Sequence, residues 1–128
     1  MTVPFWCLLI GCLLPYAWLV FTAKARSAQP EGFDNRNPRI QVTRLEGVAS
    51  WAVGAQLNAF EALPLFGSAV IVNHLVGADP VLSAKLSLAW VACRVLHGVF
   101  YLTGLHALRT LIFAAGMGCA VALFVIGA

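Results

Sequence analysis

The sequence predicts an all-α integral membrane protein, a four-helix bundle that forms a single domain over residues 1–128. Of these residues, 61% are hydrophobic and 10% are charged, whereas soluble domains have about 45–50% apolar and about 25% charged residues. The mean hydropathy is +0.87. Four apolar runs are each long enough to cross a bilayer, which takes about 20 helical residues. Because a soluble domain of this size buries only about 60–70% of its surface, a soluble enzyme domain and a disordered chain are both disfavoured.

The first predicted span covers residues 2–23, which carry no charged side chain. A cleavable signal peptide is the alternative, since Ala23-Lys24-Ala25 resembles a cleavage site. However, the residues before the apolar run lack Lys and Arg, and the basic residues follow that run instead. We therefore expect a retained transmembrane helix, with a bend at Pro15.

Charged side chains gather in the next segment, a predicted loop over residues 24–45. Its turn-forming residues are Pro30, Gly32, Asn35, Asn37 and Pro38. Residues 24–46 hold five basic and three acidic side chains. Because loops on the cytoplasmic side carry an excess of Lys and Arg, we expect this loop in the cytoplasm and both termini on the opposite side of the membrane.

Three further spans are predicted at residues 46–76, 81–103 and 106–127. Short turns at residues 77–80 and around Gly104 connect them, so neighbouring helices should run antiparallel. Small residues let helices approach closely in a bilayer, and the second span contains many of them: Ala49, Ser50, Ala52, Gly54, Ala55, Ala59 and Ala62.

Several functions are disfavoured by what the spans and the loop contain. The four cysteines lie inside apolar runs without metal-ligand spacing, so we expect small buried side chains and no metal site. The basic residues sit in one loop rather than on a folded basic face, so no nucleic-acid partner is expected. No helix carries a continuous polar stripe, which disfavours a channel or transporter.

Two charged side chains stand well inside apolar spans, away from the span ends, where an ionised group costs about 2.5–3.5 kcal/mol. These are Glu61 in the second span and Arg94 in the third. Asn58 lies three residues before Glu61 and shares its helix face. His97 and Tyr101 follow Arg94 at i+3 and i+7, so these three point the same way.

Arg109 and Thr110 lie in the first turns of the fourth span, and we expect them to converge with these groups on one pocket that faces the cytoplasm. A carboxylate suits a ligand ammonium group, and guanidinium groups suit ligand carboxylates. The inventory therefore fits a small zwitterion with excess negative charge. Arg109 and the start of its helix can also hold a thiol as thiolate, because nearby positive charge lowers a thiol pKa.

Structural explanations for the same residues remain open. Glu61 and Arg94 can neutralise each other between the second and third helices. Arg109 can anchor the fourth helix at the phosphates of the lipid headgroups.

Two sequence stretches resemble the MAPEG family, the membrane-associated proteins in eicosanoid and glutathione metabolism. The first is the Asn-x-x-Glu-x-x-Pro pattern from Asn58 to Pro64, within Ala-Gln-Leu-Asn-Ala-Phe-Glu-Ala-Leu-Pro. The second is the Arg-x-x-His-x-x-x-Tyr pattern from Arg94 to Tyr101. The resemblance covers residues 40–115, and it is greatest to small bacterial members.

The resemblance implies a homotrimer of four-helix protomers, and the likeness to bacterial members implies the bacterial inner membrane. With the loop in the cytoplasm, as its Lys and Arg excess predicts, both termini would be periplasmic. It implies glutathione as co-substrate, bound between subunits near the cytoplasmic side, and transferase or peroxidase activity on lipophilic electrophiles from the bilayer. The glutathione-binding residues would be Asn58, Glu61, Arg94, His97 and Tyr101, with Arg26 as a further candidate. The catalytic residues nearest the thiol would be Arg109 and Thr110.

The sequence departs from glutathione-using relatives on the second helix. These relatives carry arginine at the positions of Gly54 and, in some cases, Leu57. Each lost charged hydrogen bond can cost about 1.5–3 kcal/mol. The alternative function is therefore a non-catalytic membrane protein that binds a lipid or a protein partner and retains a degenerate glutathione site.

Overall fold

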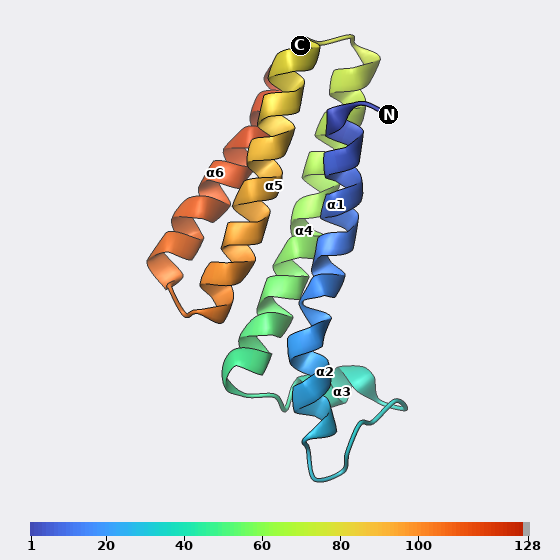
Figure 1. The fold of residues 1–128 in the computed structure, drawn as a ribbon, viewed down its shortest axis with the longest axis vertical. Helices are drawn as coiled ribbons and strands as arrows, with labels where there is room; N and C mark the ends of the chain where they lie inside the picture. Colours follow the sequence, from blue (N-terminus) through green and yellow to red (C-terminus); the bar gives the residue numbers. More distant parts are fainter. Residues whose placement is uncertain (127–128) are drawn as a thin grey trace.

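The computed structural model describes residues 1–126, and the described residues form helices without strands (Figure 1). The helices are α1 (Val3–Ala17), α2 (Leu19–Ser27), α3 (Pro38–Val42), α4 (Gly47–Leu75), α5 (Pro80–Leu102) and α6 (His106–Val125). Together α1 and α2 make one span of 25 residues, and α4, α5 and α6 are also long and apolar enough to cross a membrane. The predicted four-helix membrane fold is thereby confirmed.

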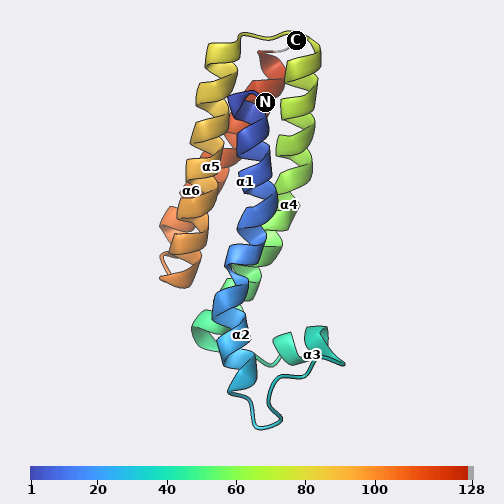
Figure 2. The same ribbon diagram turned by 45° about the vertical axis from the view of Figure 1, so that its right-hand side comes forward.

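The four spans lie side by side and alternate in direction (Figure 1). The α1 helix packs against both α4 and α5, and α6 packs along α5 (Figure 2). The N-terminus and the end of α6 lie at one end of the bundle, which we call the terminal end. The segment between α2 and α4 lies at the other, which we call the loop end (Figure 1).

The first span is interrupted and is longer than the sequence predicts. Helix α1 ends at Ala17, soon after Pro15, whose ring nitrogen cannot donate a helical hydrogen bond. Helix α2 then continues to Ser27 instead of ending at residue 23. Its last residues are mostly alanine, lysine and arginine, which favour helix strongly. The middle spans differ from the expected bounds by one residue at each end, and the predicted end of the fourth span at residue 127 lies outside the described residues.

The best-packed core lies toward the terminal end. Phe66 of α4 and Trp90 of α5 stack with ring centroids 3.7 Å apart and an interplanar angle of 5°. Gly11 of α1 makes room for this stack, since a Cβ atom there would lie 2.9 Å from the Trp90 ring. Around the stack pack Cys7, Ala69, Val70, Ala120 and Leu123.

A buried polar bridge joins three helices beside this core. Asn73 Nδ2 donates to the Leu123 carbonyl at 3.0 Å, and the Ser83 hydroxyl lies 2.6 Å from Asn73 Oδ1. An unpaired amide would be costly in an apolar environment. The bridge therefore holds α4, α5 and α6 in register at the terminal end.

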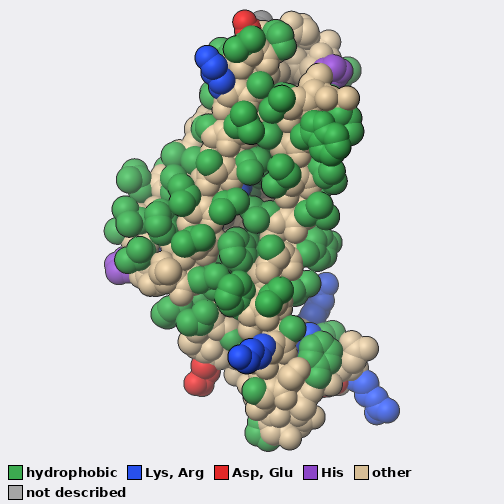
Figure 3. Space-filling view, in the orientation of Figure 1, with side chains coloured by type: hydrophobic (Ala, Val, Ile, Leu, Met, Phe, Trp, Pro, Cys, Tyr) green, Lys and Arg blue, Asp and Glu red, His purple; other side chains and the backbone are tan. Residues whose placement is uncertain are grey.

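On the face drawn in Figure 3 the surface is apolar around the middle of the bundle, and the charged side chains visible there lie mostly toward its two ends. This distribution suits a bilayer around the middle. The expectation of buried cysteines holds for Cys7 and Cys93, while Cys119 is half-buried. It is wrong for Cys12, which is exposed. Residues five apart on a helix do not share a face, so Cys7 and Cys12 cannot both point into the core.

Candidate functional site

Five of the residues selected from the sequence line one cavity of about 210 Å³. It opens between α4, α5 and α6, where α5 ends and α6 begins. Its lining is Asn58, His97, Tyr101, Arg109, Thr110 and Phe113. The spacing of the polar residues on α5 and the position of Arg109 just after the α5–α6 turn bring these groups together. We call this the Arg109 cavity.

Arg94 lies beside the cavity as a buried guanidinium, with 4% of its surface exposed. Its Nη1 donates to Asn58 Oδ1 at 3.2 Å, and its Nη2 to the Phe113 carbonyl at 3.5 Å. Its Nε has no hydrogen-bond partner among the described residues. Gly116 of α6 provides the space, since a Cβ atom there would lie 2.9 Å from Arg94 Nη2. A buried cation without a carboxylate partner is costly, and it is therefore suited to receive an anion.

Tyr101 connects α4 to Arg109. The guanidinium carbon of Arg109 lies 4.4 Å from the centroid of the Tyr101 ring, a cation–π contact. On α4, a Cβ atom at Gly54 would lie 2.7 Å from the Tyr101 hydroxyl oxygen. The phenol thus occupies the space beside the α4 backbone that a side chain at position 54 would enter. His97 is buried next to it, with ring centroids 5.5 Å apart. Gly54 therefore stands where glutathione-using relatives carry arginine, and its lack of a side chain leaves room for the Tyr101 ring that contacts Arg109.

Glu61 projects away from these groups and is exposed on the protomer. Three residues of helix advance by about 300°, so Glu61 points roughly 60° away from Asn58. Within residues 1–126 the ion pair present is Arg44 with Glu31, at 3.2 Å. The suggested Glu61–Arg94 pair is therefore not formed within the protomer, and Arg94 bonds to Asn58 instead.

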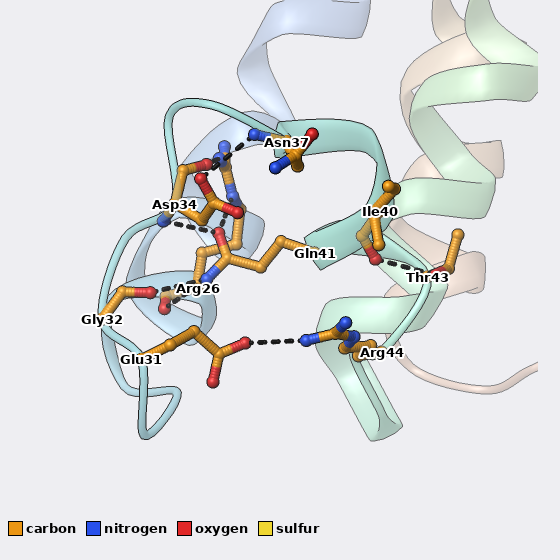
Figure 4. A network of polar contacts seen from close by, with 9 residues as sticks. All are labelled: Arg26, Glu31, Gly32, Asp34, Asn37, Ile40, Gln41, Thr43 and Arg44. Carbon is orange, nitrogen blue, oxygen red and sulfur yellow. Dashed lines mark hydrogen bonds and ion pairs between the residues drawn. The ribbon is translucent and has the colours of Figure 1, made fainter.

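Arg26 lies at the loop end and organises the loop (Figure 4). Its Nε donates to Gln41 Oε1 and its Nη2 to the Asp34 carbonyl, both at 2.8 Å. Its guanidinium also covers the Phe33 ring at 3.9 Å. The Gln41 amide is buried and donates in turn to the Gly32 carbonyl at 2.6 Å. Two of the three guanidinium nitrogens of Arg26 are therefore engaged within the loop.

The loop contains more structure than the sequence predicts. Asp34 Oδ1 accepts the backbone N–H groups of Arg36 at 2.7 Å and Asn37 at 3.1 Å. These bonds, that of Asn37 foremost, hold the pKa of the Asp34 carboxyl below its ordinary value. Helix α3 begins directly afterwards with Pro38, whose fixed φ suits a first helical position. The Asp-x-x-Asn-Pro pattern is the signal that could have revealed this turn and helix.

A larger cavity of about 550 Å³ lies at the terminal end, between the start of α1, the end of α4 and the start of α5. It contains none of the residues selected from the sequence. Its buried polar groups, Asn73 and Ser83, are hydrogen-bonded to the protein. The Arg109 cavity is smaller, but it combines a guanidinium, an imidazole and a phenol, so it is the stronger candidate for chemistry.

Comparison with known proteins agrees with this arrangement. A family model for the MAPEG family matches residues 3–128, essentially the whole chain. The chain belongs to the MAPEG family. No curated protein and no solved structure matches it. As a MAPEG member it is a multi-pass integral membrane protein with four spanning helices, of a family whose general function is glutathione-related.

Proposed function

We propose that this MAPEG protein is a glutathione-dependent transferase or peroxidase that acts on lipophilic electrophiles from the bilayer. One observation carries the proposal. Asn58, His97, Tyr101, Arg109 and Thr110 line a single cavity, and the buried guanidinium of Arg94 lies beside it. Family membership supports the same general chemistry.

The residues divide by charge into those that orient glutathione and those that activate its sulfur. Arg94 suits a glutathione carboxylate and Glu61 its ammonium group, because these pairs form charge-assisted hydrogen bonds. Asn58, His97 and Tyr101 supply further polar contacts. Arg26 is a further candidate for a carboxylate, through the part of its guanidinium that the loop does not engage.

Arg109 is the group assigned to the thiol. A nearby guanidinium stabilises the thiolate form, the reactive nucleophile. The Thr110 hydroxyl donates to the His106 carbonyl at 3.1 Å, so Arg109 is the principal donor toward the sulfur and Thr110 assists. The thiol proton passes to water. The thiolate then forms a bond to an electrophilic carbon, whose leaving group departs with the bonding electron pair.

The complete site requires a neighbouring protomer. Ligand pockets typically measure about 300–1,000 Å³, and the Arg109 cavity of about 210 Å³ is smaller. Glu61 is the fifteenth of the 29 residues of α4, at the middle of a span, and its side chain is exposed. A carboxylate facing lipid there is costly. A homotrimer in which the next protomer covers Glu61 and closes the cavity satisfies both observations.

The excess of Lys and Arg near the loop end supports a cytoplasmic site in the bacterial inner membrane, with both termini periplasmic. A cytoplasmic site would face the compartment that supplies glutathione. The lipophilic substrate would enter sideways from the bilayer.

The second candidate is a non-catalytic protein that binds a lipid or a protein partner. The observation that favours it is the absence of cationic side chains at Gly54 and Leu57 on α4. In this second candidate function, the polar residues of the Arg109 cavity and Arg94 only stabilise the fold.

Turnover assays separate the two candidates. Protein reconstituted in lipid nanodiscs is supplied with glutathione and either a halonitrobenzene or a lipid hydroperoxide. We expect protein-dependent product with at least one substrate, and its loss in the double variant Glu61→Gln, Arg94→Met. Absence of product above the uncatalysed rate with both substrates, or full activity in the double variant, would contradict the proposal.

A further inference from the structure

A second cavity of about 210 Å³ shares a wall with the Arg109 cavity. It is lined by Trp51 at the start of α4, Tyr101 near the end of α5, Gly104 in the following turn, and His106 and Arg109 at the start of α6. Tyr101 and Arg109 line both cavities. We call the second one the Trp51 cavity. Nothing in the proposed glutathione chemistry uses the side chain of Trp51 or of His106.

Trp51 forms a flat and supported wall of this cavity. A Cβ atom at Gly104 would lie 3.5 Å from two carbon atoms of the indole six-membered ring. The indole therefore rests on the backbone of the turn, while 43% of the residue stays exposed. Gly104 has a φ of +72°, a conformation that glycine adopts without strain. The turn and the indole thus form a preorganised aromatic platform.

The remaining lining selects for negative charge. Arg109 presents a guanidinium, His106 presents an imidazole that can donate a hydrogen bond, and the lining has no carboxylate. Guanidinium groups pair with carboxylates through charge-assisted hydrogen bonds. The rings of Trp51 and Tyr101 favour stacking with another planar ring. The lining therefore suits a ligand that combines a planar ring with an anionic group.

The volume limits the ring system. A cavity of roughly 150 Å³ is sufficient to hold benzene. The Trp51 cavity, at about 210 Å³, has room for one ring with one or two small substituents. Trp51 and the α5–α6 turn lie at the ends of their spans, at the depth where tryptophan is enriched and amphipathic molecules partition.

We propose that the Trp51 cavity binds a single-ring aromatic carboxylate, with its ring on the indole of Trp51 and its carboxylate on Arg109 and His106. The carboxylate of such a ligand would pair with the guanidinium of Arg109, the same group that is assigned to stabilise the glutathione thiolate. Its binding therefore opposes thiolate formation and inhibits conjugation. The inhibitory effect rests on the proposed function, whereas the binding of the aromatic acid does not.

Calorimetry with 4-nitrobenzoate on the protein in nanodiscs tests the binding. We expect wild-type protein to bind it at least tenfold more tightly than the neutral 4-nitrobenzamide, and Trp51→Ala to weaken its binding at least tenfold. Trp51→Phe, which keeps a ring, should fall between them. The matched control is Trp6→Ala, which removes an exposed tryptophan from α1 and should leave binding unchanged. Equal affinity in wild type and Trp51→Ala, or equal affinity for the acid and the amide, would overturn the inference.

Two further measurements separate this inference from the proposed function. Trp51→Ala should retain glutathione binding and helical circular dichroism, which shows that the variant is folded. If 4-nitrobenzoate binding depends on Trp51 but glutathione does not bind, the Trp51 site stands and the proposed function fails. If glutathione is conjugated but 4-nitrobenzoate neither binds through Trp51 nor inhibits, the inference fails and the proposed function stands.

Discussion

Replacing Arg109 by alanine is expected to lower kcat/KM for glutathione conjugation by about 10²–10³-fold, the usual loss for one preorganised donor at a developing or stabilised anion. Arg109 stacks on Tyr101 and lines the cavity that holds the polar cluster. Without its charge the glutathione thiol has a higher pKa, so less thiolate is present at neutral pH. The remaining activity should rise toward more alkaline pH than in the wild type. The measurement is kcat/KM as a function of pH.

Arg109→Lys is the matched control for this prediction. Lysine keeps the positive charge but lacks the planar fork that stacks on the ring. An intermediate rate with a pH profile close to wild type is expected. Full activity in Arg109→Ala would show that Arg109 does not stabilise the thiolate, and would favour the alternative that it anchors α6 at the lipid headgroups.

Replacing Arg94 by methionine is expected to weaken glutathione binding more than tenfold, because a hydrogen bond to a charged group contributes about 1.5–3 kcal/mol. The fold should survive the change. Arg94 has no carboxylate partner within the described residues, so replacing it with an apolar side chain of similar length removes the cost of keeping an unpaired charge out of water and leaves no partner charge behind. That gain offsets the lost bond to Asn58. The measurements are calorimetric titration with glutathione and the thermal midpoint of unfolding.

The control for Arg94→Met is Arg44→Met, which removes an exposed arginine from the loop. It should change neither glutathione affinity nor thermal stability appreciably, because exposed ion pairs contribute about 0–1 kcal/mol. If Arg94→Met unfolds the protein, or binds glutathione as the wild type does, Arg94 is a structural residue and the second candidate function gains support.

The fold was largely predictable because a bilayer imposes a simple rule. A helix must offer about 20 apolar residues, and four runs of this kind stand out in the sequence. The internal order of the loop was not predictable by that rule. Gln41 is buried and hydrogen-bonded to Arg26, fifteen residues earlier in the chain. A contact between residues so far apart in a loop leaves no repeating hydrophobic pattern in the sequence from which it could be predicted.

The candidate site was predictable where helical spacing alone decides geometry. His97 and Tyr101 follow Arg94 on one face of α5, and the short α5–α6 turn brings Arg109 to them. The glycine contacts were not predictable, because the neighbours of Gly54 and Gly116 come from packing between helices. The exposure of Glu61 was also missed, since spacing places it near Asn58 but does not show which face of α4 the protomer covers.

Glutathione binding to the protein in mild detergent, measured by isothermal calorimetry with Glu61→Gln as the control, tests the central claim most directly. The claim predicts a dissociation constant of about 1 mM or tighter, equivalent to roughly −4 kcal/mol or better, and a loss of binding in the variant. The exposed carboxylate of Glu61 is the group assigned to the glutathione ammonium. No binding by the wild type at millimolar glutathione, or equal binding by Glu61→Gln, would contradict the claim.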